Sequence, residues 1–124
     1  MKQRILVVDD EPQIREMLSM YFDRHGYEAS SAGNSAETMR IVQENQVDIV
    51  VLDISLADED GLKLLEDLKS AQPGLRVIML TGMGFVEDLL QEAQQKGADG
   101  YVSKVLPLDE LLSAIQRILK SPKS

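Results

Sequence analysis

The chain has 124 residues, the length of one domain, and it is long enough to bury a core without disulfides. It contains no cysteine, which excludes disulfides, thiolate zinc sites and cysteine nucleophiles. Its formal net charge of −8 would repel a phosphate backbone, and no apolar run approaches the roughly 20 residues that span a bilayer. We therefore expect a cytoplasmic globular domain that by itself binds neither nucleic acid nor membrane.

Five short apolar runs predict β-strands, at residues 5–8, 27–30, 49–52, 77–80 and 101–102. The first, third and fourth runs are continuous rather than alternating. Continuous runs of branched side chains are typical of strands that are buried on both faces of a parallel sheet. The second run is more polar, so we interpret it as an edge strand.

Amphipathic segments between these runs predict helices. The first has apolar residues at helical spacing over 14–22, with Pro12 near its start and Gly26 after its end. Asn34 is expected to cap the second helix, with Glu37 three residues later as in a capping box. Three further helices are expected around apolar positions at 62–68, 86–93 and 108–118. The alternation of strand and helix predicts an α/β fold with right-handed connections and a parallel sheet covered on both faces.

Two features outside the strand ends have simple interpretations. His25, the only histidine, falls at a predicted helix end and is interpreted as a surface residue. Met17, Met20 and Met39 are interpreted as core or near-core side chains rather than as a groove for a partner.

The residues that follow the buried runs carry the candidate chemistry, because ligands of open α/β sheets bind at the carboxyl ends of the strands. The runs are followed by Asp9-Asp10-Glu11, by Asp53, by Thr81-Gly82 and by Ser103-Lys104. Any one of these polar residues could follow a strand simply because loops are exposed to solvent, but solvent exposure explains the whole set poorly. An aspartate can act as a nucleophile toward a phosphoryl group, while lysine and threonine can bind phosphate oxygens.

From Ile5 to Leu119, the sequence resembles the response-regulator receiver domains of two-component signalling. The matching motifs are Asp9-Asp10, Asp53, Gly61 eight residues later, Thr81-Gly82, and Lys96-Gly97-Ala98 leading into Tyr101 and Lys104. Each motif alone is weak, but five in register over a repeating strand–helix pattern are specific. The chain departs from the family at Ala57 and Val105, where proline is usual, but no reactive group is missing.

The resemblance implies a flavodoxin-like fold, in which a five-stranded parallel sheet of order 2-1-3-4-5 is doubly wound with five helices. This order makes the first and third strands neighbours and brings Asp9 or Asp10 within several ångströms of Asp53. Carboxylates about 5 Å apart repel by roughly 3 kcal/mol at an effective dielectric constant of about 20, so they need a proton or a cation. Oxygen ligands favour a hard ion, and Mg²⁺ fits because it requires only one or two carboxylates.

The resemblance also implies the roles of the acidic residues. Asp53 is expected to be the phosphoacceptor. Asp9, Asp10, Asp53 and the backbone carbonyl of Ser55 are expected to hold Mg²⁺.

The other matching residues are assigned in the same way. Thr81 and Lys104 are expected to contact the phosphoryl group, with Lys104 paired to Asp53 or to its phosphate. Thr81 and Tyr101 are expected to form the switch. Ser55 and Met83 stand at the positions that flank the approach of water in this family. Because Met83 cannot orient water, we expect slow self-dephosphorylation.

The implied function is that of a receiver that accepts a phosphoryl group from a histidine kinase, a phosphotransfer protein or a small phosphodonor. Such a receiver catalyses its own Mg²⁺-dependent phosphorylation and dephosphorylation. The phosphoryl group would switch the face made by the fourth helix, fifth strand and fifth helix, and so control an output domain, homodimerisation or partner binding. The receiver domain is expected over residues 1–120, with 121–124 as a tail or the start of a linker.

Three alternatives remain at this stage. A receiver used only for protein interaction should have lost a reactive group. A flavodoxin-like cofactor binder would suffer repulsion between its cofactor phosphate and Asp9-Asp10-Glu11. A phosphatase with an aspartate nucleophile would have a second acid two residues after Asp53, where Ser55 stands instead.

Overall fold

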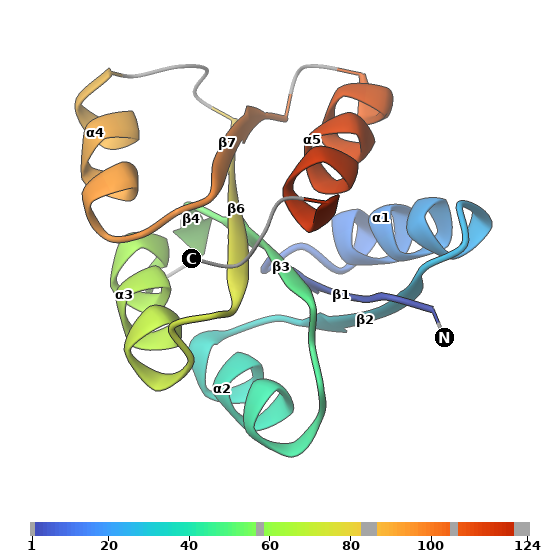
Figure 1. Ribbon diagram of the computed structural model, residues 1–124, viewed down its shortest axis with the longest axis horizontal. Helices are drawn as coiled ribbons and strands as arrows, with labels where there is room; N and C mark the ends of the chain where they lie inside the picture. The colour runs from blue at the N-terminus through green and yellow to red at the C-terminus, as the bar shows by residue number, and fades with distance from the viewer. Residues whose placement is uncertain (1, 57–58, 83–86, 105–106, 121–124) are drawn as a thin grey trace.

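The computed structural model describes residues 2–56, 59–82, 87–104 and 107–120 (Figure 1). Within these residues, one sheet contains the parallel strands β1 (Arg4–Val8), β2 (Glu28–Ala32), β3 (Ile49–Asp53), β6 (Arg76–Thr81) and β7 (Gly100–Ser103). Their order is β2-β1-β3-β6-β7. Since β6 and β7 are the fourth and fifth strands of this sheet, the predicted order is confirmed.

Helices cover both faces of the sheet, as the strand–helix alternation predicts (Figure 1). They are α1 (Pro12–Arg24), α2 (Ser35–Glu44), α3 (Gly61–Ala71), α4 (Glu87–Gln95) and α5 (Leu108–Lys120). The apolar side chains form two cores, one between the sheet and α1 and α5, the other between the sheet and α2, α3 and α4. In β1, Ile5 and Val7 belong to the first core and Leu6 and Val8 to the second, which is why the run is continuously apolar.

The helix ends follow local sequence signals. Pro12 is the first residue of α1, and Gly26 adopts a φ of +90° after its end, a conformation that favours glycine. Asn34 caps α2 by accepting a 2.9 Å hydrogen bond from the Glu37 N–H. The Glu37 carboxylate accepts from the N–H of Gly33, one residue before the partner that a capping box predicts.

The burial of α1 differs in one respect from the sequence prediction. Met17 and Met20 are 46% and 49% exposed, so their assignment to the core is wrong, whereas Met39 is half-buried against the core as expected. Only Leu18 and Phe22 of α1 are fully buried, because the helix touches the sheet along a narrow stripe. His25 is exposed at the end of α1, as predicted.

A short antiparallel pair, β4 (Ser55–Leu56) with β5 (Glu59–Asp60), lies between β3 and α3 and was not predicted. The Glu59 carboxylate accepts hydrogen bonds from the N–H and hydroxyl of Ser35, which joins this pair to the start of α2. The Asp60 side chain caps α3 by accepting from the Leu62 N–H at 2.9 Å. The end of this segment is therefore anchored to both α2 and α3.

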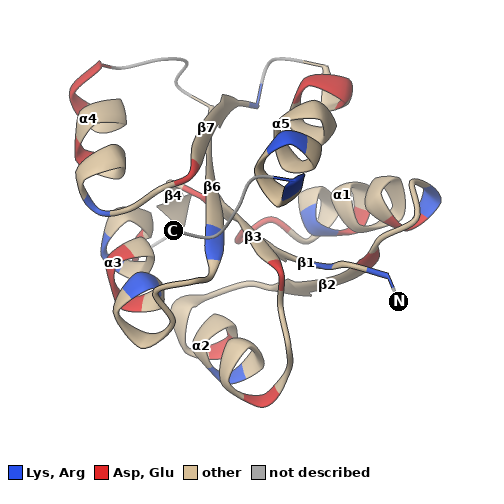
Figure 2. Cartoon of the chain, viewed as in Figure 1, with Lys and Arg blue, Asp and Glu red and all other residues tan. Residues whose placement is uncertain are grey.

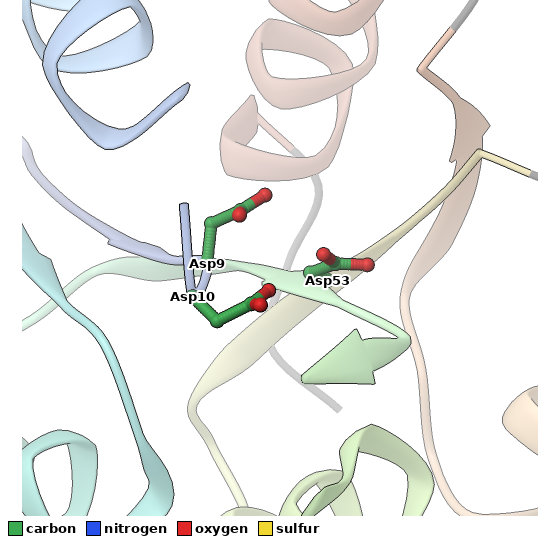
Figure 3. Close-up of side chains that lie close together, drawn as sticks. All are labelled: Asp9, Asp10 and Asp53. Atoms are coloured by element: carbon green, nitrogen blue, oxygen red, sulfur yellow. The ribbon is translucent and has the colours of Figure 1, made fainter. Parts of the chain in front are cut away.

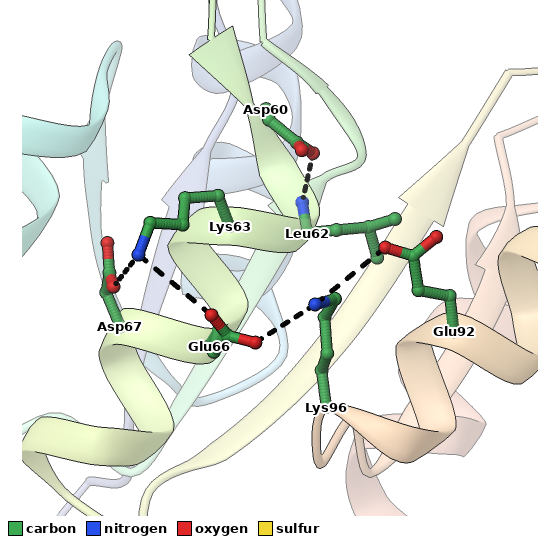
Figure 4. A network of polar contacts seen from close by, with 7 residues as sticks. All are labelled: Asp60, Leu62, Lys63, Glu66, Asp67, Glu92 and Lys96. Atoms are coloured by element: carbon green, nitrogen blue, oxygen red, sulfur yellow. Dashed lines mark hydrogen bonds and ion pairs between the residues drawn. The ribbon is translucent and has the colours of Figure 1, made fainter.

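Ion pairs connect α3 to α4 (Figure 4). Lys96, just after α4, lies 3.0 Å from a carboxylate oxygen of Glu66 and 3.8 Å from one of Glu92, and Lys63 lies 3.0 Å from one of Asp67. These pairs are at the surface, where water and salt screen the attraction between their charges. Acidic residues occur on every helix described (Figure 2), so the excess negative charge is spread over the surface. Among the described residues, no helix has the length and apolar character to cross a membrane.

Candidate functional site

Three carboxylates meet where β1 and β3 end. The two strands pair in register, with Val8 opposite Leu52, so the residues that follow them share one edge of the sheet. Asp9, Asp10 and Asp53 each offer a carboxylate oxygen, and these oxygens lie within 4.8 Å of one another (Figure 3). This is the clustering that the strand order implied.

The backbone fixes two of these carboxylates in place. Asp9 and Asp53 are only 1% and 3% exposed, whereas Asp10 is half-buried. One oxygen of Asp9 accepts from the N–H of Glu11 at 2.9 Å, and one oxygen of Asp53 accepts from the N–H of Ser55 at 3.0 Å. Both are local turns in which an aspartate bonds the backbone two residues on. Each aspartate keeps its second oxygen for other partners.

Lys104 binds both buried carboxylates. Its ammonium lies 2.8 Å from Asp53 Oδ2 and 3.0 Å from Asp9 Oδ2. The backbone places it there, because the Lys104 N–H donates to the Thr81 carbonyl at 2.7 Å and so continues the pairing of β7 with β6. The pairing of Lys104 with Asp53 was expected from the resemblance, whereas its contact with Asp9 was not.

Burial and the neighbouring charges shift the pKa values of Asp53 and Lys104 in opposite directions. Burial raises the pKa of Asp53 above its ordinary value, against the hydrogen bonds from Lys104 and Ser55, which lower it. Burial lowers the pKa of Lys104, but hydrogen bonds and charges from Asp53 and Asp9 outweigh burial and leave that pKa raised. Lys104 is therefore protonated at neutral pH.

The donor set fits a hard cation. Its three carboxylates face one ammonium, so acidic groups outnumber the cation in a largely buried cluster. The ligand atoms of the cluster are carboxylate oxygens, which suit Mg²⁺ or Ca²⁺ and not the nitrogen and sulfur chemistry of zinc. The cluster therefore has the composition of a site that could hold a hard divalent cation.

The remaining predicted residues lie on the neighbouring strands. Thr81 is fully buried at the end of β6, the strand beside β3, and so belongs to the same edge as Asp53. Tyr101 is half-buried on β7 and lines a cavity with Leu90 and Ala93 of α4. Ser55 is exposed, with its N–H bonded to Asp53.

Some of the sequence predictions fall on residues that the structure does not describe. Met83, expected to tune dephosphorylation, lies outside the described residues. So do Ala57 and Val105, the two departures from the family pattern, and the tail at 121–124.

Gly61 has a spatial reason to be glycine. A Cβ there would lie 2.5 Å from the carbonyl oxygen of Asp53 and 2.7 Å from that of Ile54. The Gly61 N–H also donates to the Ile54 carbonyl at 3.2 Å. The first residue of α3 therefore packs directly on the backbone that carries Asp53.

Arg15 is a residue near the site that the sequence analysis missed. Its guanidinium donates a 2.7 Å hydrogen bond to the backbone carbonyl of Asp9. An arginine near the start of an amphipathic helix is ordinarily solvated, so the sequence offered no signal for this contact.

The fold and the acidic edge together define a signalling domain of the receiver class, and comparison with known proteins agrees. Residues 5–116 match the response regulator receiver domain family, so the chain belongs to this family. It is 33% identical over 119 residues to sporulation initiation phosphotransferase F of Bacillus subtilis. This match covers 96% of this chain and 95% of that protein. It is also 36% identical over 116 residues to the probable transcriptional regulatory protein TcrX of Mycobacterium tuberculosis. This second match covers 94% of this chain.

The chain spans about half of TcrX, since the match covers 49% of that protein. Among solved structures, it is similar to the response regulator protein TrrA of Thermotoga maritima in complex with Mg²⁺-BeF. The TM-score is 0.83 at 32% identity, with 94% of this chain and 98% of that chain covered.

Proposed function

We propose that this receiver domain is a cytoplasmic phosphoacceptor, which takes a phosphoryl group onto Asp53 from a histidine kinase, a phosphotransfer protein or a small phosphodonor. One observation carries the proposal. The buried carboxylate of Asp53 lies 2.8 Å from the Lys104 ammonium and shares a cluster of oxygens within 4.8 Å with Asp9 and Asp10.

In the reaction, a carboxylate oxygen of Asp53 attacks the phosphorus of the donor. An oxygen–phosphorus bond forms while the bond to the leaving group breaks, and the electron pair of the broken bond stays with that group, an imidazole nitrogen or an acetate oxygen. Lys104 neutralises negative charge on the phosphoryl oxygens, and the Thr81 hydroxyl donates a hydrogen bond to one of them.

Asp9, Asp10, Asp53 and the Ser55 carbonyl would hold Mg²⁺, which when bound supplies further neutralisation of charge on the transferring group. The composition of the cluster supports this assignment, because its hard oxygen donors carry uncompensated negative charge. The likeness to TrrA, whose structure is a complex with Mg²⁺-BeF, also supports it.

The output would follow from a shift between two conformations of the domain. Moving a population from 1:99 to 99:1 requires about 5.5 kcal/mol of differential binding. A new charge-assisted hydrogen bond from Thr81 would supply roughly 1.5–3 kcal/mol, and Lys104, which already pairs with Asp53 and Asp9, would add only the difference between its new and old interactions. Tyr101, under α4, would transmit the change to the face made by α4, β7 and α5.

This face would then control an output domain, a partner protein or homodimerisation. The likeness to half of TcrX favours a receiver, spanning residues 1–120, that is followed by an output domain. The likeness to nearly all of phosphotransferase F favours a receiver that acts through partner proteins. Both arrangements use the same phosphoacceptor site.

The test is intact mass after incubation with acetyl phosphate and Mg²⁺. The wild-type protein should gain the mass of one phosphoryl group, and Asp53→Asn should gain none. Asp67→Asn, which alters an exposed carboxylate of α3, is the matched control and should behave as wild type. A mass gain in Asp53→Asn would refute the assignment of the phosphoacceptor. An unmodified wild type would favour a receiver used only for protein interaction.

A further inference from the structure

The backbone around Asp9 is held from two sides. The Asp9 N–H donates to the Ala32 carbonyl of β2 at 3.1 Å, and the Asp9 carbonyl accepts from Arg15 at 2.7 Å. That carbonyl belongs to the peptide group that joins Asp9 to Asp10. The orientation of this peptide sets the direction in which the Asp10 side chain leaves the backbone.

The guanidinium of Arg15 occupies a defined space. A Cβ built on Gly33 would lie only 3.0 Å from Arg15 Nη1, so the missing side chain of Gly33 leaves room for the guanidinium. Gly33 itself is anchored, because its N–H donates to the Glu37 carboxylate at 3.0 Å. Arg15 therefore bridges from α1 to the ends of β1 and β2.

We propose that Arg15 is a positioning residue for the metal site, and that Gly33 makes its position possible. By fixing the Asp9–Asp10 peptide, Arg15 keeps the Asp10 carboxylate turned toward Asp53. This inference rests on the proposed function, because the quantity that Arg15 controls is the affinity for Mg²⁺.

The two effects that Arg15 could have, positioning of the ligands and repulsion by its charge, predict opposite changes in Mg²⁺ affinity when Arg15 is removed. A positive guanidinium near the carboxylates repels Mg²⁺, so its removal should tighten binding if only its charge matters. If Arg15 instead orders the Asp9–Asp10 peptide, its removal should weaken binding, because the ligands must then be ordered when the ion arrives. We expect the positioning effect to dominate, since the hydrogen bond is short and partly buried.

The experiment is an NMR titration with MgCl₂ of the wild type, Arg15→Met and Arg15→Lys, followed through backbone amide shifts. Arg15→Met should weaken the Kd for Mg²⁺ about tenfold, equivalent to 1.4 kcal/mol. Arg15→Lys keeps a hydrogen-bond donor, so its Kd for Mg²⁺ should lie between those of the wild type and Arg15→Met. Arg24→Met, at the exposed end of α1, removes the same charge without touching the site and should leave the Kd unchanged.

Gly33→Ala provides a second perturbation that leaves every charge in place. Its new methyl group should push the Arg15 guanidinium by a few tenths of an ångström, and so weaken Mg²⁺ binding in the wild-type background but not in Arg15→Met. Urea unfolding without Mg²⁺ would verify that each variant is folded. An unchanged or tighter Kd in Arg15→Met, or equal effects of Gly33→Ala in both backgrounds, would overturn the role of Arg15. A wild type that binds no Mg²⁺ would instead overturn the metal site itself.

Discussion

Gly61→Ala should disturb Asp53, the proposed phosphoacceptor, without altering any polar group of the site. The added Cβ would lie 2.5 Å from the Asp53 carbonyl oxygen, whereas ordinary contacts begin at 3.4 Å, so α3 or the Asp53 backbone must move by about 0.9 Å, the difference between these distances. Overpacking of this kind costs roughly 1–3 kcal/mol of unfolding free energy. A displacement of about 1 Å at a reacting group can slow a reaction on the order of 100-fold.

The rate of phosphorylation by acetyl phosphate, followed by intact mass, and urea unfolding would measure the two effects. Gly26→Ala is the matched control, because its φ of +90° makes alanine strained while nothing lies within 4 Å of the new Cβ. It should lose about 1 kcal/mol of stability with an unchanged rate. If Gly61→Ala kept both the stability and the phosphorylation rate of the wild type, the close packing of α3 on the Asp53 backbone would be refuted.

Two predictions concern titration. Burial raises the pKa of Asp53 above its ordinary 3.8, so above pH 3.8 the unfolded chain releases this proton before the folded chain does. Without Mg²⁺, the contribution of Asp53 to the unfolding free energy should therefore fall between pH 3.8 and its raised folded-state pKa. Asp53→Asn, which lacks this proton, should show a more positive pH slope than the wild type over that range. Equal pH slopes in denaturant titrations of the two proteins would contradict this. The hydrogen bond to Asp109, with burial and the Asp109 charge, raises the pKa of Tyr21 to about 12, so phenolate absorbance should show one of the three tyrosines titrating late. Asp109→Ala, which removes both the acceptor and the charge, should bring the pKa of Tyr21 back toward 10. An unchanged titration would contradict the bond.

The sheet could be predicted because each buried strand carries its own signal. Leu6 and Val7 pack into the cores on opposite faces of the sheet, so neither face of β1 carries polar side chains. The resulting continuous apolar run is typical of a strand that is covered on both faces. The β4–β5 pair could not be predicted in the same way. Its strands have two residues each, and exposed Ser55, Glu59 and Asp60 follow no hydrophobic period. Met17 shows a similar limit, since helical spacing does not reveal how much of α1 the sheet covers.

The acidic cluster could be predicted because it depends mainly on strand order. Once β1 and β3 are neighbours, Asp9 and Asp53 must share an edge. Contacts made by long side chains depend on distances that a sequence does not contain. The second bond of Lys104, to Asp9, and the bond from Arg15 to a backbone carbonyl are both of this kind.

The bridge that Lys104 forms has a consequence for the energetics of signalling. Its ammonium already has two carboxylate partners before any phosphoryl group arrives. Phosphorylation would therefore exchange partners of an existing cation, and only the difference between old and new interactions can shift the conformational equilibrium. Under the proposed function, Lys104 would in this way set a threshold, since a ligand that neutralises the site no better than the resting pairs would leave the conformation unchanged.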